Sequence, residues 1–381
     1  MPVGGPIKRI PSMKRGSISK GAKGDKPAQQ ELPWDMIDRC LLPIIFCHAA
    51  AVLLSTILNV LRISQVSTFT LFIWFTVSTM GAILFYHNLK VSAAGKAVLV
   101  TGCDGAIGWT LAQRLDELGF TVFAGFRSRA GNADADLLKE VCSGRLHTLQ
   151  LDTTSETQIL SASLYIVEHL PDGASGLHAV VNAAAWCAMG ELEWVPFSVV
   201  RRSMDVNLLG TTRLTQAMLP LIRKARGRVV FVTSGLARVS APVRGVHCAG
   251  MAALEALASC LRRELRPRAV DVVVVAPGEY TSGNAWLSET SLLNQAKDMW
   301  EQLSQEQRKL YGKDYFEQAL RSLEKFVKGP VNLTPVTRSL VDAVQRTFPL
   351  QRYTPVTRAE KIQAFVAAHL PSSVYDVIYN K

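Results

Sequence analysis

Short, continuously apolar runs alternate with amphipathic helical stretches from Lys96 onward. The runs with strand character are residues 97–100, 121–125, 146–151, 178–183, 228–234 and 271–277. Helical periodicity is typical of the stretches between them, among them residues 106–118, 156–170, 197–224 and 248–266. Strands that are apolar at every position need cover on both faces, as in a parallel sheet. The alternation therefore predicts an α/β fold built on a doubly wound parallel sheet.

Two uncharged apolar blocks precede this region, at residues 40–61 and 66–86. A helix needs ~20 residues to cross the ~30 Å hydrocarbon core of a bilayer, and each block reaches about that length. The segment between them, Arg62 to Gln65, leaves room for a tight connection. We therefore expect an N-terminal transmembrane helical hairpin within residues 39–88. A pair of buried core helices is the alternative, which is disfavoured because neither block has a polar face.

A basic segment of low hydrophobicity, residues 1–34, opens the chain and contributes much of its net charge of +11. Its cations are Lys8, Arg9, Lys14, Arg15, Lys20, Lys23 and Lys26. Such a tail is typical of disorder and does not indicate a face that binds nucleic acid. The positive-inside tendency puts the tail on the cytoplasmic side of a membrane, and a hairpin returns the chain to the same side.

The organelle is less constrained than the membrane itself. A mitochondrial transit peptide is an alternative for the basic tail, but Pro2, Pro6 and Pro11 oppose the amphipathic helix that such peptides need. We expect an integral protein of the endoplasmic reticulum with a cytosolic folded region, and a mitochondrial membrane is the alternative. The seven scattered cysteines form no CxxC pair and no cluster with metal spacing, so we predict neither a disulfide nor a metal site.

A glycine-rich turn follows the first strand and opens a helix, with the sequence Thr101-Gly102-Cys103-Asp104-Gly105-Ala106-Ile107-Gly108. Glycines allow a tight turn, and the N–H groups at a helix N-terminus bind a pyrophosphate. This strand–turn–helix context indicates a Rossmann-type dinucleotide site. A simple turn without a ligand is the alternative. The predicted cofactor-binding residues here are Thr101, Gly102, Gly105, Ala106, Ile107 and Gly108.

The turn resembles the TGxxxGxG element of the short-chain dehydrogenases/reductases, with Gly102 and Gly108 in place and Ala106 where the middle glycine belongs. The similarity runs through residues 96–381, in phrases such as KAVLVTGCD, LPLIRKARGRVV and HLPSSVYDVIY. It is greatest to the branch of D-beta-hydroxybutyrate, retinol and 17-beta-hydroxysteroid dehydrogenases. The resemblance implies a dinucleotide-binding core at residues 96–283, a helical C-terminal extension at 284–381 that forms the substrate lid, and a homo-oligomer.

The resemblance also implies further cofactor contacts. Asp152, after the third strand, matches the family's adenine-contacting aspartate, and Ser282 falls where the family places a hydroxyl near the nicotinamide amide. Asn182 begins a segment that reads Asn-Ala-Ala-Ala where the family has Asn-Asn-Ala-Gly. The dipeptide Pro277-Gly278 matches the family's Pro-Gly after the sixth strand.

The end of the second strand bears on the choice of dinucleotide. Phe126 occupies the place of the acidic residue that would accept the ribose hydroxyls of NAD, and Arg127 follows it. A cation there suits the extra phosphate of NADP. We therefore predict NADP or NAD, with NADP slightly favoured; an exposed loop arginine without a ligand is the alternative.

The resemblance assigns four catalytic positions, and two of them are changed. Asn207, in MDVNLLG, and Ser234, at the end of RVVFVTS, match the family's relay asparagine and substrate-binding serine. His247 stands where the family has its proton-transferring tyrosine, and Met251 where it has the lysine that lowers that tyrosine's pKa. A thioether supplies no charge and no hydrogen-bond donor. Histidine, with an ordinary pKa of about 6.5, suits acid–base chemistry but is shorter than a phenol.

Three functions follow from this combination. We favour a membrane-anchored binding or regulatory protein that holds NAD(P)(H) with weak or absent turnover. The first alternative is an active NAD(P)-dependent oxidoreductase of a secondary alcohol or ketone, such as a hydroxy acid, retinoid or steroid, that uses His247. The second is a membrane scaffold without cofactor, which the retained Asn207, Ser234 and Asp152 oppose. The expected partners are the lipid bilayer and an apolar small molecule, not nucleic acid.

Overall fold

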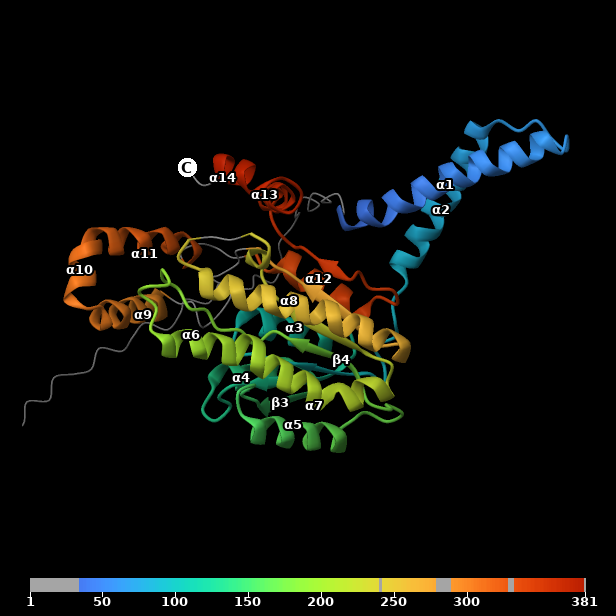
Figure 1. Ribbon diagram of the computed structural model, residues 1–381. Coiled ribbons are helices and arrows are strands. Elements are labelled where there is room, and N and C mark those ends of the chain that lie inside the picture. Colours follow the sequence, from blue (N-terminus) through green and yellow to red (C-terminus); the bar gives the residue numbers. More distant parts are fainter. Residues whose placement is uncertain (1–33, 240–241, 279–288, 328–331, 380–381) are drawn as a thin grey trace, which may run out of the picture.

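A seven-stranded parallel sheet forms the centre of the folded region (Figure 1). The computed structural model describes residues 34–239, 242–278, 289–327 and 332–379, so the basic tail up to residue 33 lies outside it. The strand order is β3-β2-β1-β4-β5-β6-β7, which confirms the Rossmann-type doubly wound sheet. The strands are β1 (Ala97–Val100), β2 (Thr121–Phe126), β3 (Leu146–Gln150), β4 (Leu177–Asn182), β5 (Arg228–Val232), β6 (Asp271–Val275) and β7 (Arg352–Tyr353).

Helices cover both faces of the sheet and complete a three-layer core (Figure 1). One face carries α3 (Ala106–Glu117), α4 (Ala133–Val141) and α12 (Thr334–Gln345). The other carries α5 (Glu156–Glu168), α7 (Thr211–Lys224) and α8 (Gly245–Leu265). Strand residues alternate between the two apolar cores, with Val98 and Val100 in the first and Ala97 and Leu99 in the second. The whole of β1 is buried, and this is why its sequence is a continuous apolar run.

The single helix expected at residues 197–224 is interrupted. A π-helical turn at Asp205–Gly210 separates α6 (Phe197–Met204) from α7. Such turns are rare and are frequent at functional sites. Asn207 lies in the turn, where its buried side-chain amide bonds to the backbone of Trp186. An apolar helical period continues through a π turn, so the sequence pattern gave no sign of it.

The region after residue 283 divides between the core and separate helices. The core includes α12, which packs on the first face, and β7, which pairs with β6. Three helices lie beside the carboxyl edge of the sheet around Trp194 and Phe316: α9 (Glu289–Gln302), α10 (Gln305–Tyr311) and α11 (Lys313–Val327). The last two are α13 (Arg358–His369) and α14 (Ser372–Tyr379). Residues 334–353 therefore belong to the core rather than to the expected extension at 284–381.

Two long apolar helices, α1 (Trp34–Val60) and α2 (Thr68–Asn88), form an antiparallel hairpin that projects from the layered core (Figure 1). The Cys47 Sγ lies 3.3 Å from Thr79 Oγ1, and the ring of His48 packs edge-on against Phe72 at 5.5 Å. Both helices are long and apolar enough to cross a membrane, and no residue of α2 is buried. Buried core helices would lose most of their exposure, so this geometry is compatible with the expected membrane hairpin.

The end of α2 is attached directly to the core. The N–H of Val91 donates to the carbonyl of Gln345 at 2.8 Å, and the N–H of Thr347 donates to the carbonyl of Leu89 at 2.9 Å. Lys90 and Arg346 form an antiparallel bridge between these bonds. The hairpin is thus joined to the end of α12 by backbone pairing.

Candidate functional site

The glycine-rich turn after β1 packs against the end of β4. Gly102 has φ of +70°, and a Cβ there would lie 2.6 Å from the Cα of Ala184. The hydroxyl of Thr101 accepts hydrogen bonds from the N–H groups of Ala183 and Ala184, both at 3.1 Å. A Cβ at Gly108 would lie 2.5 Å from the carbonyl oxygen of Gly102. Both glycines are therefore required by close backbone approach.

The turn presents the N-terminus of α3 to the carboxyl edge of the sheet. Gly105 is the N-cap and provides no side-chain cap, so the first N–H groups of the helix remain open to a ligand. Ala106 begins the helix and is half-buried, while Ile107 is buried in the core beneath it. Ile107 therefore supports the predicted phosphate site from below and does not line it.

A cavity of about 830 Å³ opens at the carboxyl edge, where the strand order reverses between β1 and β4. Open α/β sheets bind ligands at this switch point, and the volume lies within the roughly 300–1,000 Å³ range of small-molecule and cofactor pockets. Four of the predicted cofactor residues line the cavity: Gly102, Gly105, Arg127 and Asp152. The structure therefore brings together residues that are up to 50 positions apart in the chain.

Charges of both signs surround the adenosine side of this cavity. The Asp104 carboxylate accepts the N–H of Arg127 at 2.7 Å and so lies at the end of β2 beside the predicted NADP-selecting cation. The Asp152 carboxylate accepts the N–H and the hydroxyl of Thr154 at 2.8 and 2.7 Å, which fixes its orientation. The predicted preference for NADP rested on Arg127, and Asp104 opposes that charge.

Asn182 lies below the cavity at the end of β4 and is buried. Its amide nitrogen donates to Thr215 Oγ1 at 3.3 Å, while its amide oxygen has no hydrogen-bond partner among the described residues. The next three residues, Ala183 to Ala185, line the cavity. The segment thus leads from a buried asparagine at the end of β4 into the cavity wall.

The far wall of the cavity contains residues that the sequence analysis missed. The Arg202 guanidinium lies 4.9 Å from the centroid of the Trp186 ring, and both residues line the cavity with Arg201 and Arg213. Residues of α9, among them Asn294 and Asp298, close the same side. Trp186 comes soon after the Asn182 segment, which was the available signal. Tertiary packing places the arginines and α9 at the cavity, and the sequence carries no signal that would have predicted this.

Asn207, the predicted relay asparagine, braces the loop after β4. Its Oδ1 accepts the N–H of Trp186 at 2.8 Å, and its Nδ2 donates to the Trp186 carbonyl at 2.7 Å and to Ser203 Oγ at 3.2 Å. The side chain is buried, and a Cβ at Gly250 of α8 would lie 3.9 Å from it. Asn207 therefore connects α8 to the cavity wall, and both of its N–H groups are already used.

His247 and Met251, the predicted positions of the catalytic pair, lie one turn apart on α8, which places them on the same side of the helix. His247 is 6% exposed and Met251 is 2% exposed, and neither lines the cavity. Burial, with a smaller contribution from the Arg244 guanidinium, lowers the pKa of His247 to about 4. The imidazole is therefore neutral at pH 7, whereas the sequence analysis assigned it an ordinary pKa near 6.5.

Ser234 is positioned by contacts on both sides of it in the chain. The Thr233 hydroxyl donates to the Glu255 carboxylate of α8 at 3.1 Å, and the N–H of Gly235 donates to the carbonyl of Pro277 at 2.7 Å. Gly278 in turn donates its N–H to Pro355 at 3.2 Å. The turn with Ser234 is thus tied both to α8 and to the predicted Pro-Gly element. Ser282 lies outside the described residues.

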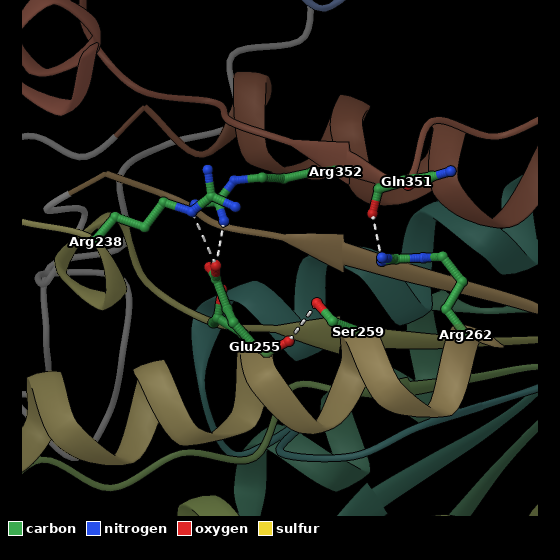
Figure 2. Close-up of polar contacts among 7 residues, drawn as sticks. Arg238, Glu255, Ser259, Arg262, Gln351 and Arg352 are labelled. Atoms are coloured by element: carbon green, nitrogen blue, oxygen red, sulfur yellow. Dashed lines mark hydrogen bonds and ion pairs between the residues drawn. The ribbon is translucent and has the colours of Figure 1, made fainter. Parts of the chain in front are cut away.

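Glu255 holds α8 to the neighbouring elements (Figure 2). Its carboxylate accepts the Arg238 Nε at 3.2 Å and also binds Arg352 of β7, as the dashed lines show. Two turns further along α8, Arg262 donates to the Gln351 carbonyl at 3.1 Å. These bonds fix the position of α8, so the burial of His247 and Met251 is a property of the packed fold.

No group of His, Cys, Asp and Glu among the described residues is arranged to hold a metal ion.

Comparison with known proteins agrees with this geometry. The family model for short chain dehydrogenase matches residues 96–290. D-beta-hydroxybutyrate dehydrogenase, mitochondrial, of Rattus norvegicus is 36% identical over 299 residues, which cover 77% of this chain and 86% of the relative. The chain belongs to the short-chain dehydrogenase family.

Other members of the same branch match over a similar length. Estradiol 17-beta-dehydrogenase 2 of Mus musculus is 36% identical over 290 residues, 75% of this chain and 74% of the relative. Retinol dehydrogenase 16 of Mus musculus is 35% identical over 285 residues, 74% of this chain and 87% of the relative. The predicted family and branch are confirmed. Because these names cover a hydroxy acid, a steroid and a retinoid, they do not select one substrate.

Solved structures of the family share the fold. A short-chain dehydrogenase from Streptomyces avermitilis has a TM-score of 0.57 at 21% identity and covers 74% of this chain and 95% of its own. One from Burkholderia cenocepacia J2315, in complex with NADP, has a TM-score of 0.56 at 20% identity and covers 76% of this chain and 99% of its own. The layered sheet of this chain therefore has the fold of the solved short-chain dehydrogenases.

The residues around the cavity fit the dinucleotide that this family binds. The uncapped N-terminus of α3 suits a pyrophosphate, and Asp152 and Arg127 suit the polar groups of an adenosine. Asn182, whose buried amide oxygen has no partner among the described residues, precedes the alanines that line the cavity. Four predicted cofactor residues thus line one cavity, whereas His247 and Met251, at the predicted proton-transfer positions on α8, lie outside its lining.

Proposed function

We propose that this short-chain dehydrogenase is a membrane-anchored NAD(P)(H)-binding protein with weak or absent turnover, which acts by binding or regulation. The observation that carries the proposal is the pair His247 and Met251, which are buried on α8 and do not line the cavity that holds the predicted dinucleotide residues. A bound nicotinamide would supply or accept a hydride. The accompanying proton must then be moved by the protein.

His247 is poorly suited to move that proton. With a pKa of about 4, roughly one imidazole in 10³ is protonated at pH 7, so it cannot serve as an efficient acid for ketone reduction. As a base for alcohol oxidation it is weak for the same reason. Met251 offers no charge to change this balance. An active oxidoreductase that uses His247 stays the alternative, and native turnover decides between the two.

The helices α1 and α2 support a membrane location. We propose that these helices span the endoplasmic reticulum membrane and hold the sheet on its cytosolic side, with a mitochondrial membrane as the alternative. Their exposed apolar surfaces support this, because Phe46 is 65% and Trp74 69% exposed. The related dehydrogenases suggest a hydroxy acid, retinoid or steroid as ligand.

The proposal predicts dinucleotide binding by the purified full-length chain in detergent. Titration with NADPH and NADH, followed by the fluorescence of the nicotinamide and of the cavity residue Trp186, should give saturable binding. Trp186→Phe is the control that separates the signal of this residue from that of other tryptophans. Absence of binding of either dinucleotide at concentrations of about 1 mM, equivalent to about −4 kcal/mol, would favour the scaffold without cofactor.

The opposed charges at the end of β2 predict a small preference between the two dinucleotides. We expect NADPH to bind more tightly than NADH by less than about tenfold, which is about 1.4 kcal/mol. Arg127→Ala should weaken NADPH and leave NADH nearly unchanged, and Asp104→Asn should strengthen NADPH. Arg129→Ala is the matched control, because Arg129 is an exposed cation nearby that does not line the cavity. Equal effects of Arg127→Ala on both dinucleotides would contradict a phosphate contact.

A further inference from the structure

Six exposed cations gather at the edge of the sheet where its strands begin. Arg223 and Lys224 end α7, Arg263 lies in the last turn of α8, and the rest lie in the connections to β5 and β6. We call this group the basic edge: Arg223, Lys224, Arg226, Arg263, Arg266 and Arg268. None of the six makes an ion pair with a carboxylate of the described residues.

Helix capping explains part of this group. Cations in the last turn of a helix are favoured by its dipole, which accounts for Arg223, Lys224 and Arg263. Arg226, Arg266 and Arg268 lie beyond the ends of α7 and α8. Nearby acidic side chains are few: Asp271 pairs with the buried Arg228 at 3.7 Å, and Glu264 and Asp172 are exposed. The edge therefore keeps a net positive charge.

The basic edge is held next to the end of the hairpin. The Arg346 carbonyl, in the backbone pairing that attaches α2, accepts a hydrogen bond from Arg228 Nη1 at 2.8 Å. Arg228 begins β5 two residues after Arg226, and its ion-pair partner Asp271 begins β6 three residues after Arg268. Figure 1 draws the C-terminal ends of α7 and α8 on the same side of the core as the lower end of α2.

Aromatic side chains mark the level at which α2 would leave a bilayer. Tyr86, in the last turn of α2, packs edge-on against Phe348 with ring centroids 5.6 Å apart. Both rings are about half exposed, and Phe85 is 63% exposed. Tyrosine, with its amphipathic ring, is enriched at the headgroup level of membranes, so Tyr86 suits that level. Because Arg228 connects the strand next to Arg226 with the attachment of α2, we expect the basic edge to lie near the headgroups, where charges interact over ~8–10 Å at physiological salt.

We propose that the basic edge binds the headgroups of anionic phospholipids in the leaflet that α2 enters. This inference rests on the proposed membrane anchoring and adds an orientation to it. With the amino edge of the sheet against the bilayer, the carboxyl edge and its cavity face the aqueous phase, from which a soluble dinucleotide arrives. A neutral leaflet would leave the same anchor in place without this second contact.

The test uses the full-length chain in vesicles, with a dye on Cys260, the exposed cysteine of the described residues, which lies on α8 near the basic edge. Energy transfer to an acceptor on the lipid headgroups reports the approach of the edge. We expect about twofold higher transfer in vesicles of phosphatidylcholine with phosphatidylserine than in phosphatidylcholine alone. The difference should vanish at about 1 M NaCl, where the Debye length falls to about 3 Å.

Charge-reversal variants test which cations bind the lipid headgroups. Arg226→Glu, Arg266→Glu and Arg268→Glu together should abolish the dependence on phosphatidylserine. The matched control reverses three exposed cations elsewhere, Lys139, Lys309 and Arg358, and should keep it. Equal transfer in both lipids, or an unchanged response in the first variant, would overturn the proposal. The same increase produced in neutral vesicles by inorganic phosphate would assign the edge to free phosphate instead and overturn it as well.

Anchoring is scored separately, by flotation of the vesicles after an alkaline wash. A chain that fails to float refutes the proposed membrane anchoring. A chain that floats but shows no lipid-dependent transfer refutes the basic edge alone.

Discussion

The double variant His247→Tyr with Met251→Lys should turn over a hydroxy acid, retinol or steroid substrate about 10²–10⁴-fold faster than the native chain. The phenol and the ammonium would restore the acid–base pair on α8, beside Asn207 and Ser234, which are already present. Acid–base groups that act as a unit are gained and lost together, so each single variant should gain little. Steady-state oxidation of 3-hydroxybutyrate, retinol and estradiol with NAD and NADP measures the effect.

Because His247 and Met251 are buried, the double variant needs controls for stability and volume. Met251 is 2% exposed, so Met251→Lys alone places an ammonium in an apolar site and should destabilise the fold by several kcal/mol. The pair His247→Phe with Met251→Leu keeps a comparable volume and should raise no activity. A double variant that folds, binds NADPH with native affinity and still shows no gain would mean that another part of the catalytic machinery has also been lost.

Gly108→Ala should weaken dinucleotide binding by about 100-fold or more. A Cβ at this position would lie 2.5 Å from the carbonyl oxygen of Gly102, closer than real Cβ contacts allow, so α3 must move away from the turn. The displaced helix N-terminus would no longer meet the pyrophosphate. The NADPH titration measures the loss, and the thermal midpoint of unfolding shows whether the sheet is intact.

Gly144→Ala is the matched control, because a Cβ there would meet no atom within 4 Å. It should leave NADPH affinity unchanged. If Gly108→Ala folds and binds NADPH as tightly as the native chain, the dinucleotide does not use the turn at residues 101–108.

The sheet and the turn could be predicted from the sequence because their signals are local. The buried run at residues 97–100 is a strand with both faces covered, and the glycines that follow are required by contacts within a few ångströms. β7 was missed because two residues carry no periodicity. Its place in the sheet depends on pairing with β6, which is distant in the chain.

Much of the cavity wall could not be predicted, for the same physical reason. Arg202 stacks on Trp186, and α9 reaches the cavity from more than 90 residues beyond them. The π turn that lets Asn207 bind the backbone of Trp186 leaves the apolar period intact. The low pKa of His247 comes from burial and from Arg244, and neither is visible from the residue type.

The central claim is that this protein keeps its dinucleotide cradle but has lost the side chains that transfer protons. Stopped-flow measurement of hydride transfer in the native chain, saturated with dinucleotide and substrate and compared with His247→Ala, tests it most directly. We predict transfer that is slow and equal in the two proteins. Rapid transfer in the native chain, at the roughly 1–10³ per second that is typical of enzymes, that His247→Ala abolishes would contradict the claim and identify His247 as the catalytic acid–base.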